Sequence, residues 1–190
     1  MRKYAILLVL ILASCVRESQ PPARQENACS ILDQRNGWLR DMQKTEAVWG
    51  APVAIQMAII WKESNFRSRA RTSKRKPFLG FISRGRISSA FGFSQALDGT
   101  WEDYQRDTGA RRARRTDYGD STDFIGWYMA KSNRVNGIAM DDAYNQYLAY
   151  HQGQAGYARG SYRGKAWLLD VARQVQNRAD LYENQLANCS

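Results

Sequence analysis

Histidine is nearly absent from this sequence, which has one histidine and three cysteines among 190 residues. A lone histidine, with no metal-ligand spacing elsewhere, argues against a metal site, because such sites gather several His, Cys or carboxylate ligands. We therefore expect no metal and no other cofactor. Internal repeats and low-complexity segments are missing too, and the chain has the length of one globular domain with a sizeable core.

The apolar run near the N-terminus is short, because it extends only from Ala5 to Leu12 behind two basic residues. It is too short to cross a membrane as a helix and has the layout of a secretory signal peptide. The Leu-Ala-Ser-Cys sequence that ends at Cys15 resembles the lipobox of bacterial lipoproteins, in which the cysteine is acylated and becomes the mature N-terminus. The alternative is an ordinary signal peptide followed by an unrelated cysteine.

Three segments follow from this pattern: a signal peptide over 1–14, a lipidated flexible tether over 15–27 and a domain over 28–190. The tether prediction depends on two prolines and on missing apolar periodicity. Val16 and Arg17 do not resemble the aspartate that retains many lipoproteins at the inner membrane. We therefore expect the protein to be located at the outer membrane, facing the periplasm.

Cys29 and Cys189 lie at opposite ends of the domain. An oxidising periplasm favours a disulfide between them, which would join the two ends of the domain. Two unpaired thiols are the alternative.

The net charge is +10, from 28 Lys and Arg against 18 Asp and Glu. A surface this basic attracts polyanions. Behind a signal peptide, the polyanions are peptidoglycan, whose stem peptides carry carboxylates, and anionic lipid. We expect these partners, a monomeric chain and no nucleic acid.

Helical periodicity covers most of the domain, so the predicted fold class is mainly α. Gly50 and Pro52 separate the first helix from a second one that is apolar on most of its surface. Between Arg67 and Ser89 the pattern breaks, and there we predict a small β-hairpin with strands over 77–82 and 87–93. The predicted helices span 31–49, 53–64, 100–107, 122–136, 141–150 and 168–186.

Three short motifs occur in order along the chain: Glu63-Ser64 at the end of the apolar helix, Gly92-Phe93-Ser94-Gln95, and Ala149-Tyr150-His151-Gln152-Gly153. Together they resemble the motifs of lytic transglycosylases with a goose-lysozyme-like fold, the soluble lytic transglycosylase family. The family pattern is Glu-Ser at a helix end, a Gly-Leu-Met-Gln loop and an Ala-Tyr-Asn-x-Gly loop. The resemblance extends over about 36–157 and implies a lysozyme-like helical domain with the hairpin inserted after the catalytic helix.

Glu63 matches the catalytic glutamate of that family. The resemblance implies cleavage of the bond between N-acetylmuramic acid (MurNAc) and N-acetylglucosamine (GlcNAc) in peptidoglycan, with Glu63 as acid and then base, leaving 1,6-anhydro-MurNAc ends. A carboxyl at the end of an apolar helix suits this role, because desolvation raises its pKa. From Ser64 through Leu97 the chain has no Asp or Glu, and this gap favours transglycosylation over hydrolysis. Asp98 and the aspartates of 117–123 keep a muramidase as an alternative.

The resemblance also implies substrate-binding residues. Ser64 and Gln95 match residues near the catalytic acid, and Tyr150 matches a tyrosine whose hydroxyl holds the carboxyl in position. Ser94 stands where the family has methionine, and His151 where it has asparagine. We expect His151 to provide a loop or substrate hydrogen bond.

The stretch between Phe66 and Ala90 is basic and longer than the family's usual link. It is interpreted either as a solvated loop or as a surface over 67–90 that steers glycan strands or docks a partner in an envelope complex. A peptidoglycan-binding or accessory lipoprotein without catalytic activity is the alternative to an enzyme.

Overall fold

The computed structural model describes residues 20–71, 75–78, 82–86 and 88–189. The predicted signal peptide over 1–14 and the lipidation site Cys15 lie outside these residues. Within the described residues, no helix has both the length and the apolar character needed to cross a membrane.

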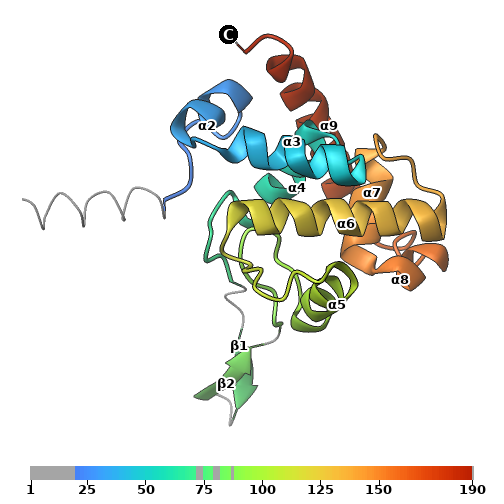
Figure 1. Ribbon diagram of the computed structural model, residues 1–190. Helices are drawn as coiled ribbons and strands as arrows, with labels where there is room; N and C mark the ends of the chain where they lie inside the picture. Colours follow the sequence, from blue (N-terminus) through green and yellow to red (C-terminus); the bar gives the residue numbers. More distant parts are fainter. Residues whose placement is uncertain (1–19, 72–74, 79–81, 87, 190) are drawn as a thin grey trace, which may run out of the picture.

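The described residues form eight helices and one two-stranded antiparallel sheet, so the prediction of a mainly α fold is confirmed (Figure 1). Figure 1 shows α6 running across the body, with the hairpin projecting away from the helices. The elements are α2 (Ala28–Gln34), α3 (Trp38–Trp49), α4 (Val53–Ser64), β1 (Arg75–Phe78), β2 (Ile82–Arg86), α5 (Asp98–Thr108), α6 (Tyr118–Asn136), α7 (Ala143–Gln152), α8 (Gln154–Ala158) and α9 (Ala166–Leu186).

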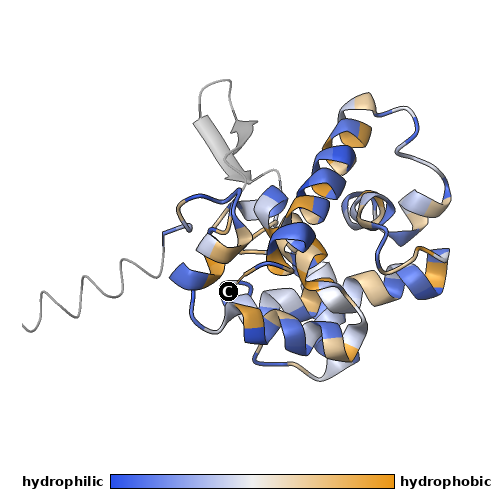
Figure 2. Cartoon of the chain, turned by 90° about the horizontal axis from the view of Figure 1, so that it is seen from above, coloured by the Kyte–Doolittle hydropathy of each residue, from blue (hydrophilic) through white to orange (hydrophobic). Residues whose placement is uncertain are grey.

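Helix α4 is the centre of the core and packs against α3, α6 and α9. Its residues from Val53 to Ile60 are all buried, in agreement with the broad apolar pattern of this helix. Burying a side chain the size of Met57, Ile59 or Ile60 contributes about 1.5–3 kcal/mol each. The outer helices are amphipathic, and hydrophilic and hydrophobic residues alternate along them in Figure 2.

Both ends of α4 are fixed by local backbone signals. Gly50 adopts the left-handed conformation with φ 75° and ends α3, and Pro52 then precedes the first residue of α4. At the other end, Asn65 takes φ 49° and ends the helix directly after Ser64. These two boundaries agree with the predicted helix over 53–64 and place Glu63 in its last turn.

The predicted first helix over 31–49 is wrong in one respect, because the structure divides it into α2 and α3. Gly37 adopts a left-handed φ of 93° between them. An α-helix cannot continue through this conformation, and glycine adopts it without steric cost.

Helix starts were predicted less well than helix ends. The N-caps of α5, α6 and α7 are Leu97, Asp117 and Asp142, each one to five residues before or after the predicted start. Asp117 and Asp142 accept a backbone N–H of the first turn, which is the interaction that defines a cap. Helix α8 was not predicted, since its five residues carry no periodic pattern.

The hairpin lies in the predicted insertion, but its turn was misplaced. Strand β1 pairs antiparallel with β2 in the register Phe78 with Ile82 and Arg75 with Arg86. Residues 83–86, predicted as the turn, therefore belong to the second strand. Of the predicted first strand over 77–82, residues 77–78 belong to β1 and Ile82 opens β2, and residues 79–81 lie outside the described residues.

Cys29 and Cys189 form a disulfide with a Cα–Cα distance of 5.5 Å, which confirms the predicted pairing. The bond joins α2 to the end of α9 across 160 residues of sequence. Closing a loop of this length contributes about 4–5 kcal/mol in the chain-entropy model.

The last residues of the predicted flexible tether contact the domain instead of extending from it. Pro22 is buried, and the backbone of Ala23 donates to the side chain of Gln34 at 3.0 Å. The carbonyl of Gln25 accepts hydrogen bonds from Tyr182 and Arg178 on α9. A backbone carbonyl has the same hydrogen-bonding capacity in any sequence, so a polar, proline-rich composition did not reveal this docking.

Candidate active site

Glu63 lies in the last turn of α4, and its side chain is only partly exposed to solvent. The hydroxyl of Tyr147 on α7 donates a hydrogen bond of 2.9 Å to Glu63 Oε1. Burial and the neighbouring Glu63 raise the pKa of Tyr147 well above its ordinary value, so this hydroxyl keeps its proton and remains a donor.

The pKa of Glu63 is raised from 4.5 to about 7. Desolvation by burial is the largest cause, and it is opposed by the hydrogen bond from Tyr147 and by the charge of Lys62. Near neutral pH the carboxyl is therefore present in both its protonated and its ionised form. This is the property required of a group that first donates and then accepts a proton.

The Gly92–Gln95 loop is held by its own backbone and by one side chain. Gly92 has φ 82°, and a Cβ atom there would lie 1.9 Å from the carbonyl oxygen of Arg115, so only glycine fits. The amide nitrogen of Gln95 donates to the carbonyl oxygens of Ala70 and Gly92, at 2.9 and 2.8 Å. Gln95 thus ties the loop to the segment that follows α4.

Tyr150 contacts this loop and does not donate a hydrogen bond to the Glu63 carboxyl. Its hydroxyl donates to the carbonyl oxygen of Ser94 at 2.6 Å. The expected partner of Glu63 is therefore replaced by Tyr147, which lies three residues earlier on α7. Tyr147 was not among the predicted site residues. A buried tyrosine hydroxyl needs a hydrogen-bond partner, but the sequence does not say which residue provides it.

Two of the predicted substrate-binding serines are buried. Ser64 donates its hydroxyl to the carbonyl of Ile60 at 3.0 Å, within α4. Ser94 is fully buried, and its hydroxyl has no hydrogen-bond partner among the described residues. In this structure neither hydroxyl faces solvent, so both positions differ from the expected contact with sugar.

His151 is exposed at the C-terminal end of α7. Its Nδ1 forms a hydrogen bond of 2.8 Å with the side-chain amide nitrogen of Gln152, a contact within the loop. Its ring meets Trp167 edge-on, with 5.2 Å between the ring centroids. Partial burial and the charge of Lys165 lower the pKa of His151 below its usual value.

The aspartates on which the alternative of a muramidase depended form contacts with other residues than Glu63. Asp98 pairs with Arg115 at 2.7 Å, and Asp123 accepts hydrogen bonds from Tyr104 and Trp49. Asp117 and Asp120 accept backbone N–H groups at and before the start of α6. Among the described residues, no second carboxylate contributes to the pKa of Glu63.

A cavity of about 850 Å³ lies between the end of α2, the start of α3 and the start of α6. Its lining includes Trp38, which stacks on Tyr118 with 3.7 Å between ring centroids, and Phe93, which meets both rings edge-on. Glu63, Tyr147 and Tyr150 are not part of the lining. The phenylalanine at the family's leucine position is therefore a core residue that packs against Trp38 and Tyr118.

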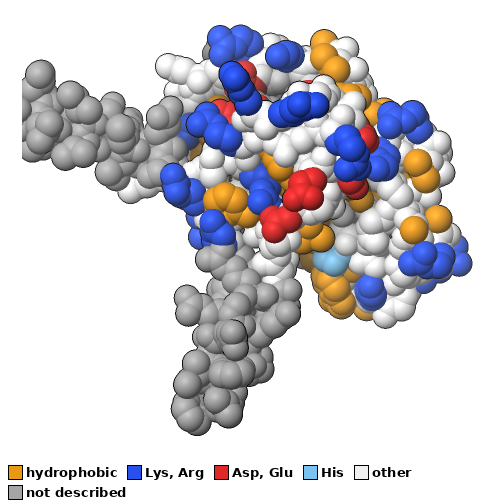
Figure 3. Space-filling model, turned by 60° about the horizontal axis from the view of Figure 1, so that its bottom comes forward, with side chains coloured by type: hydrophobic (Ala, Val, Ile, Leu, Met, Phe, Trp, Pro, Cys, Tyr) orange, Lys and Arg blue, Asp and Glu red, His pale blue; other side chains and the backbone are white. Residues whose placement is uncertain are grey.

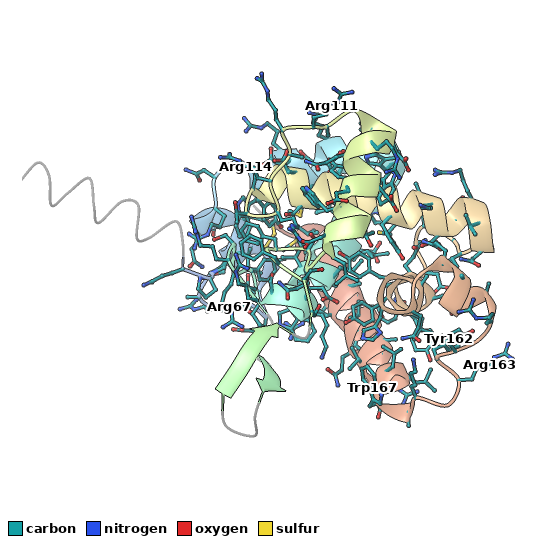
Figure 4. All side chains as sticks on the ribbon, turned by 90° about the horizontal axis from the view of Figure 1, so that it is seen from below. Arg67, Arg111, Arg114, Tyr162, Arg163 and Trp167 are labelled. Carbon is teal, nitrogen blue, oxygen red and sulfur yellow. A yellow bond between two sulfur atoms is a disulfide. The ribbon has the colours of Figure 1, made fainter. Side chains whose placement is uncertain are left out.

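The basic segment after α4 uses part of its charge for internal contacts. Arg67 donates to the carbonyl of Ser64 at 3.1 Å, and Arg71 lies over the ring of Phe91 at 3.9 Å. Figure 4 shows Arg67 near the base of the hairpin. Lys74 lies outside the described residues.

Within the described part of the chain, no three His, Cys, Asp or Glu side chains gather in a way that could hold a metal ion.

Comparison with known families gives one finding that covers almost the whole chain. The family model described as transglycosylase SLT domain matches residues 3–189. No curated protein matches the chain.

Proposed function

Because the chain belongs to the transglycosylase SLT domain family, which implies binding of peptidoglycan and transglycosylase activity on it, we propose that it cleaves the MurNAc–GlcNAc β-1,4 bond by using Glu63 as acid and then as base. The observation that supports this proposal best is a carboxyl with a pKa of about 7 that accepts a hydrogen bond from Tyr147, with no second carboxylate of the described residues contributing to that pKa.

In the first step, protonated Glu63 gives its proton to the glycosidic oxygen as the bond to C1 of MurNAc breaks. The leaving GlcNAc keeps that oxygen as its free hydroxyl. The carbonyl oxygen of the acetamido group on MurNAc supports the positive charge that develops at C1. The hydrogen bond from Tyr147 orients the carboxyl throughout and stabilises the carboxylate that the first step produces.

In the second step, the Glu63 carboxylate takes the proton of the C6 hydroxyl of the same MurNAc. The O6 oxygen then attacks C1, the acetamido oxygen is released, and a 1,6-anhydro-MurNAc end remains. Glu63 returns to its protonated form and no water is consumed. A second carboxylate that activates water, as in an inverting glycosidase, is therefore not needed.

The test is to incubate the purified chain, lacking residues 1–15, with peptidoglycan sacculi and to identify the released muropeptides by mass spectrometry. We expect anhydro-MurNAc ends, and we expect Glu63→Gln to release none while still binding sacculi. Glu102→Gln removes one exposed carboxyl on α5 and serves as the matched control, with full activity. Reducing MurNAc ends would indicate a muramidase, and release no greater than that of Glu63→Gln would indicate a binding protein.

We also propose that Cys15 is acylated and anchors the protein to the outer membrane, facing the periplasm. The Leu-Ala-Ser-Cys sequence supports this proposal. Two or more acyl chains would hold the protein stably, since each buried methylene contributes about 0.8 kcal/mol. Mass spectrometry of the N-terminal peptide from the native membrane tests it. A mature chain that begins after a cleavage site other than the one before Cys15 would contradict it.

A further inference from the structure

One face of α7 leads from the Glu63 carboxyl to the protein surface. Tyr147 and His151 are four residues apart, and side chains at this spacing lie on the same side of a helix. Tyr147 is buried and bonded to Glu63, whereas His151, about 6 Å further along the axis, is exposed. The last turn of α7 therefore connects the neighbourhood of the Glu63 carboxyl with the protein surface.

An exposed aromatic ring stands at the end of this route. Trp167, in the first turn of α9, is 56% exposed, and its ring meets that of His151. Its neighbour Leu168 is fully buried and occupies the inward side of the helix, so packing of α9 does not require a tryptophan at position 167. In Figure 3, the histidine, shown in pale blue, lies next to hydrophobic side chains.

Polar groups meet at Gln152, whose side-chain nitrogen bonds to His151. The side-chain oxygen of Gln152 accepts hydrogen bonds from Lys165 Nζ at 2.6 Å and from Ser161 at 2.8 Å. An ammonium has three donors, and this contact uses one of them. Figure 4 shows Trp167 on the same side of the molecule as Tyr162 and Arg163, away from Arg111 and Arg114.

We propose that Trp167, His151 and Lys165 form a binding subsite for a MurNAc residue of the glycan strand, at the end of α7 that follows Tyr147 and the bond at Glu63. The apolar C–H face of the pyranose would stack on the exposed indole. Lys165 would meet the carboxylate of the lactyl group or of the stem peptide attached to it. This inference rests on the proposed function, since that function supplies the glycan strand.

The experiment measures binding separately from cleavage. The full chain carrying Glu63→Gln is titrated by calorimetry with peptide-free glycan hexasaccharides and with chitin hexasaccharides, which lack the lactyl carboxylate. We expect Trp167→Ala to raise the Kd for the glycan about tenfold, as for an anchoring aromatic. Trp167→Phe should restore most of the binding. Leu181→Ala removes a side chain that is 39% exposed on the same helix and should leave the Kd unchanged.

Lys165→Gln distinguishes a muramyl subsite from general sugar stacking. We expect it to weaken binding of the glycan hexasaccharide several-fold more than binding of the chitin hexasaccharide. An unchanged Kd for Trp167→Ala, or an equal loss for both ligands with Lys165→Gln, overturns the inference. If the wild-type chain cleaves sacculi and Trp167→Ala binds normally, only this inference fails. If nothing is cleaved but binding depends on Trp167, the subsite stands and the proposed reaction fails.

Discussion

Replacing Glu63 with glutamine should stabilise the protein at alkaline pH and leave its stability unchanged in acid. The pKa of Glu63 is about 7 in the folded protein against an ordinary value of 4.5, so the folded state binds this proton more tightly than the unfolded state. As the pH rises from 4.5 to 7, the unfolded chain gives up the proton first, and the wild-type protein loses stability over this window. Glutamine does not ionise, so the variant does not lose stability over this pH window.

The size of the effect follows from the two pKa values. Each pKa unit between the folded and unfolded states corresponds to about 1.4 kcal/mol, which gives an upper bound of about 3.5 kcal/mol above pH 7. Part of the Glu63 side chain reaches solvent, so we expect about 2–3 kcal/mol. For a domain of this size, that corresponds to a melting temperature higher by roughly 5–10 °C at pH 8.

The assay is urea unfolding of both proteins at several pH values between 4 and 8, without reductant so that the disulfide stays intact. The glutamine side-chain oxygen can still accept the hydrogen bond from Tyr147, and the comparison therefore isolates the charge. Glu102→Gln controls for the loss of one negative charge from the surface. If the difference between wild type and Glu63→Gln is the same at every pH, or grows towards acid, the desolvation argument for Glu63 is refuted.

Three further predictions concern the Tyr147 hydrogen bond, the backbone at Gly92 and the disulfide. Tyr147→Phe removes the hydrogen bond that lowers the pKa of Glu63, so we expect a smaller kcat and an alkaline limb of the pH–rate profile at higher pH; an unmoved limb would contradict this. Gly92→Ala forces a Cβ into a backbone carbonyl and should lower the free energy of unfolding by more than about 2 kcal/mol; Gly109→Ala, also at positive φ but in open space, should cost less in the same urea titration. Cys189→Ser should lower the free energy of unfolding by up to about 4–5 kcal/mol, and reductant should destabilise the wild type but not this variant.

The sequence was most informative where a local signal and a long apolar pattern agree. The position of Glu63 could be predicted because Gly50 and Pro52 fix the start of α4 and its buried residues form a continuous pattern. The disulfide could be predicted because only two cysteines remain once Cys15 is set aside. The break between α2 and α3 had a local signal as well, an Asn-Gly pair at 36–37, which the apolar pattern on both sides obscured.

The partner of Glu63 could not be predicted, because it depends on how α7 is rotated against α4. Tyr147 and Tyr150 are three residues apart and therefore lie close together around the helix. A small rotation decides which hydroxyl reaches the carboxyl and which reaches the carbonyl of Ser94. Motif matching assigns roles by position in the sequence and contains no information on this rotation. The buried hydroxyl of Ser64 has another cause, because it bonds to the carbonyl of Ile60 within α4.

A single carboxyl that acts alone needs a pKa between those of a good acid and a good base, and two opposing effects in this structure give Glu63 such a value. Desolvation at the end of α4 raises the pKa, while the Tyr147 hydrogen bond and the charge of Lys62 hold it near 7. A hydrolase that assigns acid and base to two carboxylates needs no such balance, since each group can be adjusted separately. Asp123 is committed to Trp49 and Tyr104 and cannot serve as that second group without breaking two hydrogen bonds. The balance at Glu63 thus matches a reaction in which the nucleophile belongs to the substrate and one residue handles both protons.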